Sequence, residues 1–503
     1  MEKGDEFRLS AELIKAREYE CEKEVLIRPE DRPYYHLSSR VGWMNDPNGF
    51  SWYNGQYHLF YQYHPYDSHW GPMHWGHAVT EDFIHWEYLP CAMAPDTVPD
   101  ADGCFSGSAI TLPDGRHMLM YTGVVKDGED PFGFTKLVQT QNLAFGDGIS
   151  YEKYSRNPVL TGKDLPEGGS LFAFRDPRIW KAEDGTYRAL AANDNEDSGG
   201  QMLLFRSDDA LHWTFVKTFA RNNNRIGKMW ECPDFFNLDG QYVLIGSSQD
   251  MLPKELEYHN GNGTFYMFGD YDPETETFYE RSNHAIDYGI DFYAPQTLLT
   301  PDGRRIMIGW MQNWDTCNLH VKSTPWFGQM SIPRELHVRN GILYQTPVKE
   351  LNMLRKTEMV HENILIEDRG ITLPGVFGRT ADMELMIEAA DPERMFQKFA
   401  VRFAENEEHH TGVSFRPHES ILKIDRKFSG SRRAIIHQRR ALVRHDRGKI
   451  KLHLLIDRFS VEVFVNDGEK VLSATINTDP RADGISFHAD GSVRISVRHC
   501  HLK

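Results

Sequence analysis

Paired turn residues recur through the first two-thirds of the chain and constrain its fold more than any other feature. Each pair is Asn-Gly or Asp-Gly between two apolar runs, which is the strongest local signal for a β-hairpin. The five pairs are Asn54-Gly55, Asp114-Gly115, Asp184-Gly185, Asp239-Gly240 and Asp302-Gly303. Their spacing of 55 to 70 residues indicates one strand-rich unit that repeats. We therefore predict a five-bladed β-propeller over residues 34–346, with a sandwich of unrelated hairpins as the alternative.

The register of this repeat places acidic residues at matching positions. The residue eight positions before the turn is Asp46 in the first repeat, Asp176 in the third and Glu231 in the fourth. The second and fifth repeats have Ser106 and Ala294 there. Equivalent positions of a propeller lie at equal heights around its axis. We therefore expect three carboxyl groups to meet at one end of the central funnel.

The segments on either side of the repeats differ from them in character. Residues 1–33 include a helix that Ser10 is expected to cap, so we predict a partly helical N-terminal extension. Residues 347–360 are polar and predict a linker, and alternating apolar residues over 361–503 predict a β-sandwich. Apart from the extension, the chain is expected to be all-β. An Arg- and Lys-rich stretch at 425–449 fits solvated strand faces, or a contact with an anion or a second subunit.

The composition excludes several classes of function. The chain has 503 residues and a formal net charge of −17, so it lacks the basic footprint of a protein that binds nucleic acid or anionic membranes. The sequence has no run of 18 apolar residues, so no transmembrane helix is predicted, and the acidic N-terminus has no secretory h-region. The six cysteines have no zinc or redox spacing, which is typical of reduced thiols. We therefore predict a cytoplasmic protein without nucleic-acid or membrane partners.

Convergent carboxyl groups in a funnel suit the cleavage of a glycosidic bond. One carboxylate attacks or assists at the anomeric carbon, while a protonated partner donates to the leaving oxygen. Burial and neighbouring negative charge keep such a partner protonated near neutral pH. The three acids could instead bind Ca²⁺, but none has the spacing of a calcium loop and each is followed by a proline within three residues. We therefore predict no metal and no cofactor.

Three motifs around these acids resemble the signature motifs of glycoside hydrolase family 32, which includes invertases, fructan hydrolases and sucrose-6-phosphate hydrolases. They are Trp43-Met44-Asn45-Asp46-Pro47-Asn48-Gly49, Phe174-Arg175-Asp176-Pro177 and Glu231-Cys232-Pro233-Asp234. Stretches that also agree include Phe105-Ser106-Gly107-Ser108-Ala109, Asp291-Phe292-Tyr293-Ala294-Pro295-Gln296 and Ser331-Ile332-Pro333-Arg334-Glu335-Leu336. The resemblance runs from about residue 34 to the C-terminus. The family's five-bladed propeller followed by a β-sandwich agrees with the repeats counted above.

The resemblance implies a role for each acid. Asp46 would be the nucleophile that forms a fructosyl-enzyme intermediate, and Glu231 would be the general acid and then the base that activates water. Asp176 would hold sugar hydroxyls in the transition state and would be kept ionised by Arg175 beside it. Cys232 is expected to be a packed thiol that tunes Glu231, because no sequence signal pairs it with a histidine. This retaining mechanism needs about 5–5.5 Å between the two catalytic carboxyl groups.

The resemblance also implies a fructose pocket with polar and aromatic walls. Trp and Phe offer apolar surface to the furanose ring, whereas Asn, Gln and Ser offer hydrogen bonds to its hydroxyls. For each aromatic residue taken alone, a place in a blade core is the alternative. The matching positions are Asn45, Gln62, Trp70, Phe105, Ser106, Arg175 and Trp310.

The implied activity is that of a β-fructofuranosidase, a retaining hydrolase that releases terminal β-linked fructose from sucrose and fructo-oligosaccharides. Hydrolysis of sucrose 6-phosphate or of fructans and fructosyl transfer would use the same site and are the alternatives. A non-catalytic sugar-binding propeller would be expected to lack one of the acids. An inverting pentosidase on a related scaffold would need about 6.5–9.5 Å between its carboxyl groups. The predicted partner is a small-molecule β-fructoside, and the sequence leaves chain length, linkage preference and homo-oligomer formation open.

Overall fold

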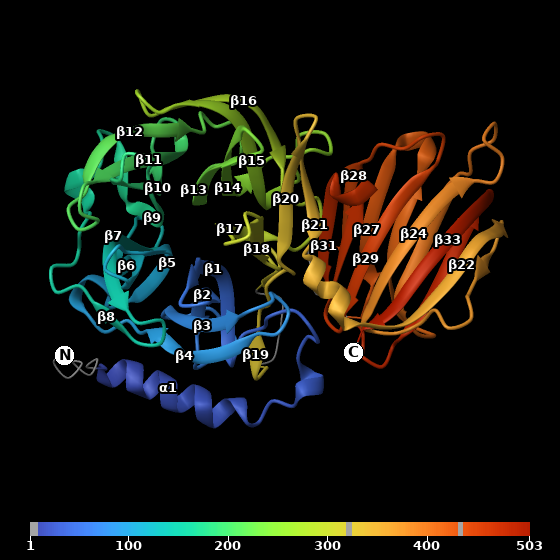
Figure 1. The fold of residues 1–503 in the computed structure, drawn as a ribbon, viewed down its shortest axis with the longest axis horizontal. Coiled ribbons are helices and arrows are strands. Elements are labelled where there is room, and N and C mark those ends of the chain that lie inside the picture. The colour runs from blue at the N-terminus through green and yellow to red at the C-terminus, as the bar shows by residue number, and fades with distance from the viewer. Residues whose placement is uncertain (1–8, 318–323, 431–435, 503) are drawn as a thin grey trace.

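β-Sheets dominate the structure, which is a computed structural model that describes residues 9–317, 324–430 and 436–502. The sheets are consistent with a propeller followed by a C-terminal sandwich (Figure 1). The N-terminal helix α1 (Ala11–Glu24) packs against the first sheet, and Ser10 accepts the backbone N–H of Leu13 at 3.1 Å, which confirms the predicted N-cap. No helix in the described ranges is long and apolar enough to cross a membrane.

The N-terminal part of the chain folds into consecutive antiparallel sheets. The first contains β1 (Gly42–Tyr53), β2 (Gln56–His64), β3 (His74–Thr80) and β4 (Glu87–Met93), joined by β19 (Trp326–Phe327). The second contains β5 (Gly103–Thr111), β6 (His117–Glu129), β7 (Thr135–Gly146) and β8 (Tyr151–Lys153). The third contains β9 (Gly169–Lys181), β10 (Tyr187–Asn195), β11 (Gly199–Ser207) and β12 (Thr214–Arg221). The fourth contains β13 (Trp230–Leu238), β14 (Gln241–Met251), β15 (Gly261–Asp272) and β16 (Thr277–Ala285). The fifth contains β17 (Tyr293–Leu299), β18 (Arg305–Trp310), β20 (Arg334–Arg339) and β21 (Ile342–Pro347).

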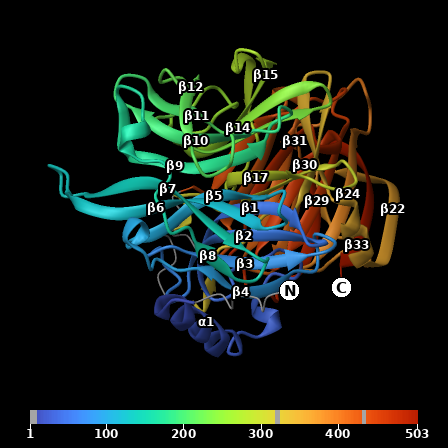
Figure 2. The same ribbon diagram turned by 60° about the vertical axis from the view of Figure 1, so that its left-hand side comes forward.

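The first strands of these sheets contact one another in a closed order. Strand β1 contacts β5, β5 contacts β9, β9 contacts β13, β13 contacts β17, and β17 contacts β1. Figure 1 shows these sheets arranged around a common centre, and Figure 2 shows the same sheets after a turn of 60°. Strand β19 pairs in parallel with β1, and Gly42 donates its backbone N–H to the carbonyl of Pro325 at 2.9 Å. Main-chain hydrogen bonds therefore tie the segment after β18 to the first sheet.

The C-terminal part forms two six-stranded sheets. The predicted linker at 347–360 contains the 3-10 helix η5 (Lys349–Leu354) and the start of β22 (Arg355–Glu367). One sheet contains β22, β24 (Ala381–Ala389), β29 (Ile450–Asp457), β30 (Ser460–Val465), β31 (Lys470–Thr475) and β33 (Ser492–Leu502). The other contains β23 (Gly370–Ile371), β25 (Lys398–Glu405), β26 (His410–Arg416), β27 (Ile421–Phe428), β28 (Gln438–Leu442) and β32 (Gly484–Asp490).

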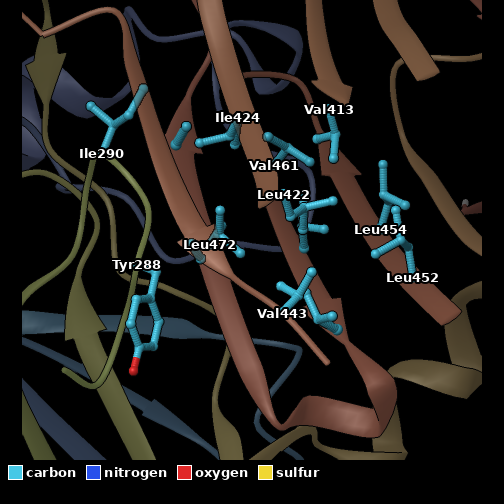
Figure 3. Close-up of a cluster of buried hydrophobic side chains, with 14 of the residues drawn as sticks. Tyr288, Ile290, Val413, Leu422, Ile424, Val443, Leu452, Leu454, Val461 and Leu472 are labelled. Atoms are coloured by element: carbon cyan, nitrogen blue, oxygen red, sulfur yellow. The ribbon is translucent and has the colours of Figure 1, made fainter. Parts of the chain in front are cut away.

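Alternating aliphatic residues fill the space between these two sheets. The buried ones include Leu422, Ile424, Leu452, Leu454 and Val461. Tyr288 and Ile290, which precede β17, belong to the same apolar cluster (Figure 3). Their backbone N–H groups donate to the carbonyls of Val471 at 2.8 Å and Ser473 at 2.7 Å in β31. The core of the sandwich therefore extends into the N-terminal part of the chain.

A buried network of charges also joins the two parts. His36 is hydrogen-bonded to Asp457 at 2.7 Å and to Glu462 at 3.0 Å, both of which belong to the sandwich. Arg334, which has no exposed surface, donates to the same Glu462 at 2.9 Å. Burial lowers the pKa of His36, but the two carboxylates outweigh burial and raise it to about 9. Glu462 therefore lies between two buried cations.

Arginines from the basic stretch at 425–449 contribute to this contact between the two parts. Arg426 is buried and donates to Asp291 at 2.6 Å. Arg439 donates to a backbone carbonyl at 2.9 Å in the loop before β15. Both side chains contact the N-terminal part of the same chain. The sequence had predicted solvated strand faces, or a contact with an anion or a second subunit. Positions 431–435 of the stretch lie outside the described residues.

Replacing Glu462 with alanine would remove the carboxylate from between its two buried cations. Truncation of one member of a buried charge network leaves the others unpaired, so we expect a loss of about 3–5 kcal/mol in the free energy of unfolding. Thermal unfolding followed by circular dichroism would record this loss as a lower midpoint. The matched control Glu358→Ala removes an exposed ion pair with Arg498 and should leave the midpoint almost unchanged. Equal midpoints in the two variants would contradict the role of Glu462.

Candidate active site

The first strand of every N-terminal sheet carries one extra residue at the same place. The pairing of β1 with β2 shifts between Met44 and Pro47, and the pairing of β13 with β14 shifts between Glu231 and Asp234. Strands β5, β9 and β17 have the corresponding shift. Such a β-bulge bends the strand and redirects its side chains, and bulges are over-represented beside active sites. Each predicted acid lies within a bulge or at its edge.

These bulges show that the predicted register of the fourth repeat is wrong by one residue. Asp176, Cys232 and Ala294 occupy the same place, because each has a left-handed φ, of 59°, 49° and 51°, and each precedes a proline. Cys232 is therefore the counterpart of Asp176, and Glu231 lies one position earlier. The count of eight residues ignores both loop length and further bulges. The fourth hairpin has a shorter loop than the third, with Leu238 paired directly to Gln241, and the first hairpin has an equally short loop but a second bulge between Asn48 and Ser51.

We divide the side chains at the bulges into two tiers by sequence, and the first tier is the residue before the proline of each bulge, or before Gly107 in β5. The first tier comprises Asp46, Ser106, Asp176, Cys232 and Ala294. The second tier comprises the residue before each of these, namely Asn45, Phe105, Arg175, Glu231 and Tyr293. Hydrogen bonds within each tier join residues of different strands.

In the first tier, a serine and a cysteine contact the two aspartates. Ser106 donates from Oγ to Asp46 Oδ2 at 2.7 Å, and Cys232 Sγ lies 3.6 Å from the same oxygen. The sulfur also lies 3.5 Å from Asp176 Oδ2, which accepts the Cys232 backbone N–H at 3.0 Å. The thiol therefore lies between the two carboxyl groups. This differs from our expectation that Cys232 tunes Glu231, since the thiol's hydrogen bonds go to the aspartates.

Burial dominates the ionisation of both aspartates, whose exposed fractions are 8% for Asp46 and 6% for Asp176. Burial, reinforced by the charge of Glu231, raises the pKa of Asp46 to about 6, although the hydrogen bond from Ser106 opposes this rise. Burial also raises the pKa of Asp176, and the positive charge of Arg175 offsets this only in part. Arg175 therefore favours the ionised form of Asp176 as expected, but burial acts in the opposite direction and has the larger effect on the pKa.

In the second tier, three donors hold Glu231. Arg175 donates from Nε to Oε1 of Glu231 at 3.0 Å. Gln249 at 2.9 Å and the hydroxyl of Tyr293 at 2.7 Å both donate to Oε2. Sequence reasoning assigned no role to Gln249 or Tyr293. Tyr293 could have been found, because it precedes the proline-containing bulge of β17 as Arg175 precedes that of β9, whereas no sequence signal distinguishes Gln249.

The polar residues predicted to bind substrate lie beside these acids or within the core. Asn45 accepts the indole N–H of Trp43 at 2.7 Å and donates to Asp46 at 3.1 Å. Gln62 is buried and donates to the carbonyl of Cys104 at 3.0 Å. Both amides are therefore oriented by the protein itself, and Asn45 touches the first predicted acid directly.

The aromatic residues predicted to bind substrate differ in exposure. Trp70 is 46% exposed and meets the ring of Phe105 edge-on, with centroids 6.1 Å apart. Trp310 has no exposed surface and packs against Trp43 and Trp314, with centroid distances of 6.0 and 5.1 Å. A fully buried ring offers no surface to a ligand, so we correct the prediction for Trp310, which supports Trp43 instead.

The charge of the three acids is balanced in part by an arginine. Within the described part of the chain, no group of three or more His, Cys, Asp or Glu side chains could hold a metal ion. Arg175 already forms an ion pair with Glu231 at 2.9 Å. The remaining two carboxyl groups make the site acidic, which suits a transition state with oxocarbenium-ion character.

Comparisons with known proteins agree with this geometry. The family model "Glycosyl hydrolases family 32 N-terminal domain" matches residues 36–347, and the model "Glycosyl hydrolases family 32 C terminal" matches residues 350–502. The sucrose-6-phosphate hydrolase of Escherichia coli is 36% identical over 470 residues, covering 92% of this chain and 93% of that protein. The raffinose invertase of Escherichia coli is 35% identical, covering 91% and 92%.

A solved structure extends the comparison to three dimensions. The GH32 β-fructofuranosidase of Bombyx mori is 34% identical, with a TM-score of 0.81 over 97% of this chain and 98% of that one. A variant of the same enzyme in complex with sucrose gives a TM-score of 0.82. This chain therefore belongs to glycosyl hydrolases family 32 and is a β-fructofuranosidase-type glycoside hydrolase.

Proposed function

We propose that this enzyme releases terminal β-linked fructose from sucrose and fructo-oligosaccharides through a covalent fructosyl-enzyme intermediate. The observation that carries this proposal is the contrast between two buried carboxyl groups. Asp46 is contacted by the neutral donors Ser106, Asn45 and Cys232, so no bound cation competes for its charge. Glu231 is held by Arg175 and two neutral donors. Glycoside hydrolases use two carboxyl groups whose environments differ, and Asp46 and Glu231 supply such a pair.

In the first step, a carboxylate oxygen of Asp46 attacks the anomeric carbon while Glu231 gives its proton to the leaving oxygen. The Glu231 proton would reside on Oε2, where the hydroxyl of Tyr293 is 2.7 Å away. A hydroxyl both donates and accepts, so Tyr293 can hydrogen-bond to Oε2 in either protonation state. In the second step, Glu231 takes a proton from water, and the water oxygen displaces Asp46.

Asp176 is proposed to hold the sugar rather than to exchange protons with it. Its Oδ2 accepts the Cys232 backbone N–H at 3.0 Å, and its own backbone N–H donates to Thr122 Oγ1 at 3.0 Å. These contacts fix the carboxyl group where it can accept hydrogen bonds from sugar hydroxyls. Such bonds strengthen as positive charge develops on the furanose ring.

The surrounding pocket is proposed from the same predicted positions, without Trp310. We propose that the consecutive N-terminal sheets are the five blades of a propeller, whose closed ring of first strands surrounds the site. The residues that would contact substrate are Asn45, Gln62, Trp70, Phe105, Ser106 and Arg175. A cytoplasmic location stays a prediction, and the formation of homo-oligomers stays open.

Sucrose 6-phosphate is the second candidate substrate, favoured by a cation beside the site. The E. coli relative at 36% identity is a sucrose-6-phosphate hydrolase. A cavity of about 580 Å³ next to the third sheet is lined by Asp194 and Lys228 among others. The charges of Lys228 and Arg175 both act on Asp194, and Arg175 also forms an ion pair with Glu231 at 2.9 Å. Lys228 would then be the group that contacts a phosphate on the leaving glucose.

Fructose release from sucrose and from sucrose 6-phosphate, measured side by side, tests the proposed activity. We expect release from at least one of them, and Asp46→Asn should lower kcat by at least about a thousandfold while the thermal midpoint is kept. A preference for the phosphorylated substrate that disappears in Lys228→Gln would favour the second candidate. Absence of fructose from both substrates, or an active Asp46→Asn enzyme, would contradict the proposal.

Replacing Glu231 with glutamine should reveal its role through the leaving group. Sucrose has a poor leaving group that needs a proton, so its kcat/KM should fall by about 10²–10⁴-fold. An aryl β-fructoside with an acidic phenol as leaving group needs no proton, so its kcat/KM should fall by less than about tenfold. Equal losses on both substrates would argue against general acid catalysis by Glu231.

The pH dependence should report the ionisation of Asp46. Since the nucleophile must be a carboxylate, and burial raises the pKa of Asp46 to about 6, kcat/KM should decline as the pH falls below that value. Ser106→Ala removes a hydrogen bond that lowers this pKa, so the acidic limb should move to higher pH. The control Ser207→Ala, buried elsewhere and paired with Asp209, should not move it. An unmoved limb in Ser106→Ala would assign it to another group.

A further inference from the structure

A second cavity lies on the outer face of one sandwich sheet, in a different domain from the acids. Its volume is about 400 Å³, within the range of about 300–1,000 Å³ that is usual for small-molecule sites. Strands β25, β26, β27 and β32 form it. Its ionisable lining comprises Lys398, Arg402, Lys423, Lys427, His410 and His488, with the acids Asp425 and Asp490.

The strand pattern explains why this face is hollow. Along β25, Phe399, Val401 and Phe403 are buried in the core, so the residues between them face outward. Ala400 pairs with Ser414, and Arg402 pairs with Gly412 across β26. Small residues therefore make the floor, and the long cationic side chains stand around it.

The positive charge of this cavity is not fully balanced by the protein. Lys423 pairs with Asp425 at 2.8 Å and Arg402 with Glu405 at 3.7 Å, but Lys398 and Lys427 form no ion pair with a carboxylate in the described ranges. Burial, together with the charges of Lys423, Arg416 and Arg402, lowers the pKa of Lys398. Excess cations held together in this way are stabilised by a bound anion.

An aromatic surface lies beside these cations. The ring of His410 stacks on Phe428 with centroids 5.4 Å apart and an interplanar angle of 28°. Phe428 is 44% exposed, so part of its ring surface is open to a ligand. A ligand that combines negative charge with a flat or ring-shaped part would use both features of the cavity.

We propose that this cavity binds a small phosphate-bearing metabolite, such as a nucleotide or a sugar phosphate. The phosphate groups would contact Lys398, Arg402 and Lys423, and the ring of the ligand would lie on Phe428. The cationic surface is a bounded hollow on a chain of net charge −17, which favours a small anion over a nucleic acid. The proposal is independent of the active site, because none of these residues belongs to the two tiers.

Calorimetric titration of the full-length enzyme with inorganic pyrophosphate and with ADP tests this proposal. We expect saturable binding of both probes, and the double variant Lys398→Gln/Lys423→Gln should weaken both by at least about tenfold. Phe428→Ala should weaken ADP by at least about threefold and leave pyrophosphate unchanged. The control double variant Arg447→Gln/Lys449→Gln removes two exposed cations elsewhere on the sandwich and should change neither affinity.

Fructose release, measured on the same samples, separates loss of the cavity from loss of the fold. Every variant should keep the wild-type rate, because its substitutions lie outside the active site. No saturable binding of either probe to the wild type would overturn the proposal, and so would unchanged affinities in Lys398→Gln/Lys423→Gln. Binding of a long polyanion such as heparin without binding of pyrophosphate would also overturn it, since it would indicate a surface for a macromolecule.

Discussion

The chemistry of this enzyme depends on one extra residue in the first strand of each N-terminal sheet. In a regular strand, consecutive side chains point to opposite faces, so Arg175 and Asp176 would be separated. The bulge breaks this alternation, and the proline after Asp176 and after Cys232 fixes the altered backbone. Both tiers of side chains can then reach one site. The rest of each sheet holds the first strands in a ring. The bulge lets two consecutive side chains of a first strand face the same site.

The two tiers give the proposed nucleophile and the proposed acid different surroundings. Asp46 belongs to the first tier, and its partners in the two tiers are hydroxyl, amide and thiol groups. Glu231 belongs to the second tier, where its partners include a guanidinium and a phenol. Displacement by one residue therefore places one carboxyl group among neutral donors and the other beside a cation.

Features encoded by neighbouring residues could be predicted from the sequence, whereas features that depend on distant segments could not. The hairpin turns, the N-cap at Ser10 and the three motifs with their acids are local signals, and the structure contains them. The register of the fourth repeat was wrong because it depends on loop length, and the role of Trp310 was wrong because its exposure depends on Trp43 and Trp314. The partner of Arg175 was also missed, since Glu231 lies 56 residues away in the chain.

The dependence on distant segments extends to the sandwich, whose sequence contains no catalytic set. Asp291 precedes β17 and accepts a hydrogen bond at 2.6 Å from Arg426 of the sandwich. Two residues later, Tyr293 donates to Glu231 at 2.7 Å. One short segment is therefore anchored in the second domain at Asp291 and contacts the proposed general acid at Tyr293. Removal of the sandwich would leave Asp291 without its buried cation at the base of the strand that carries Tyr293, so the sandwich supports the segment that contacts Glu231.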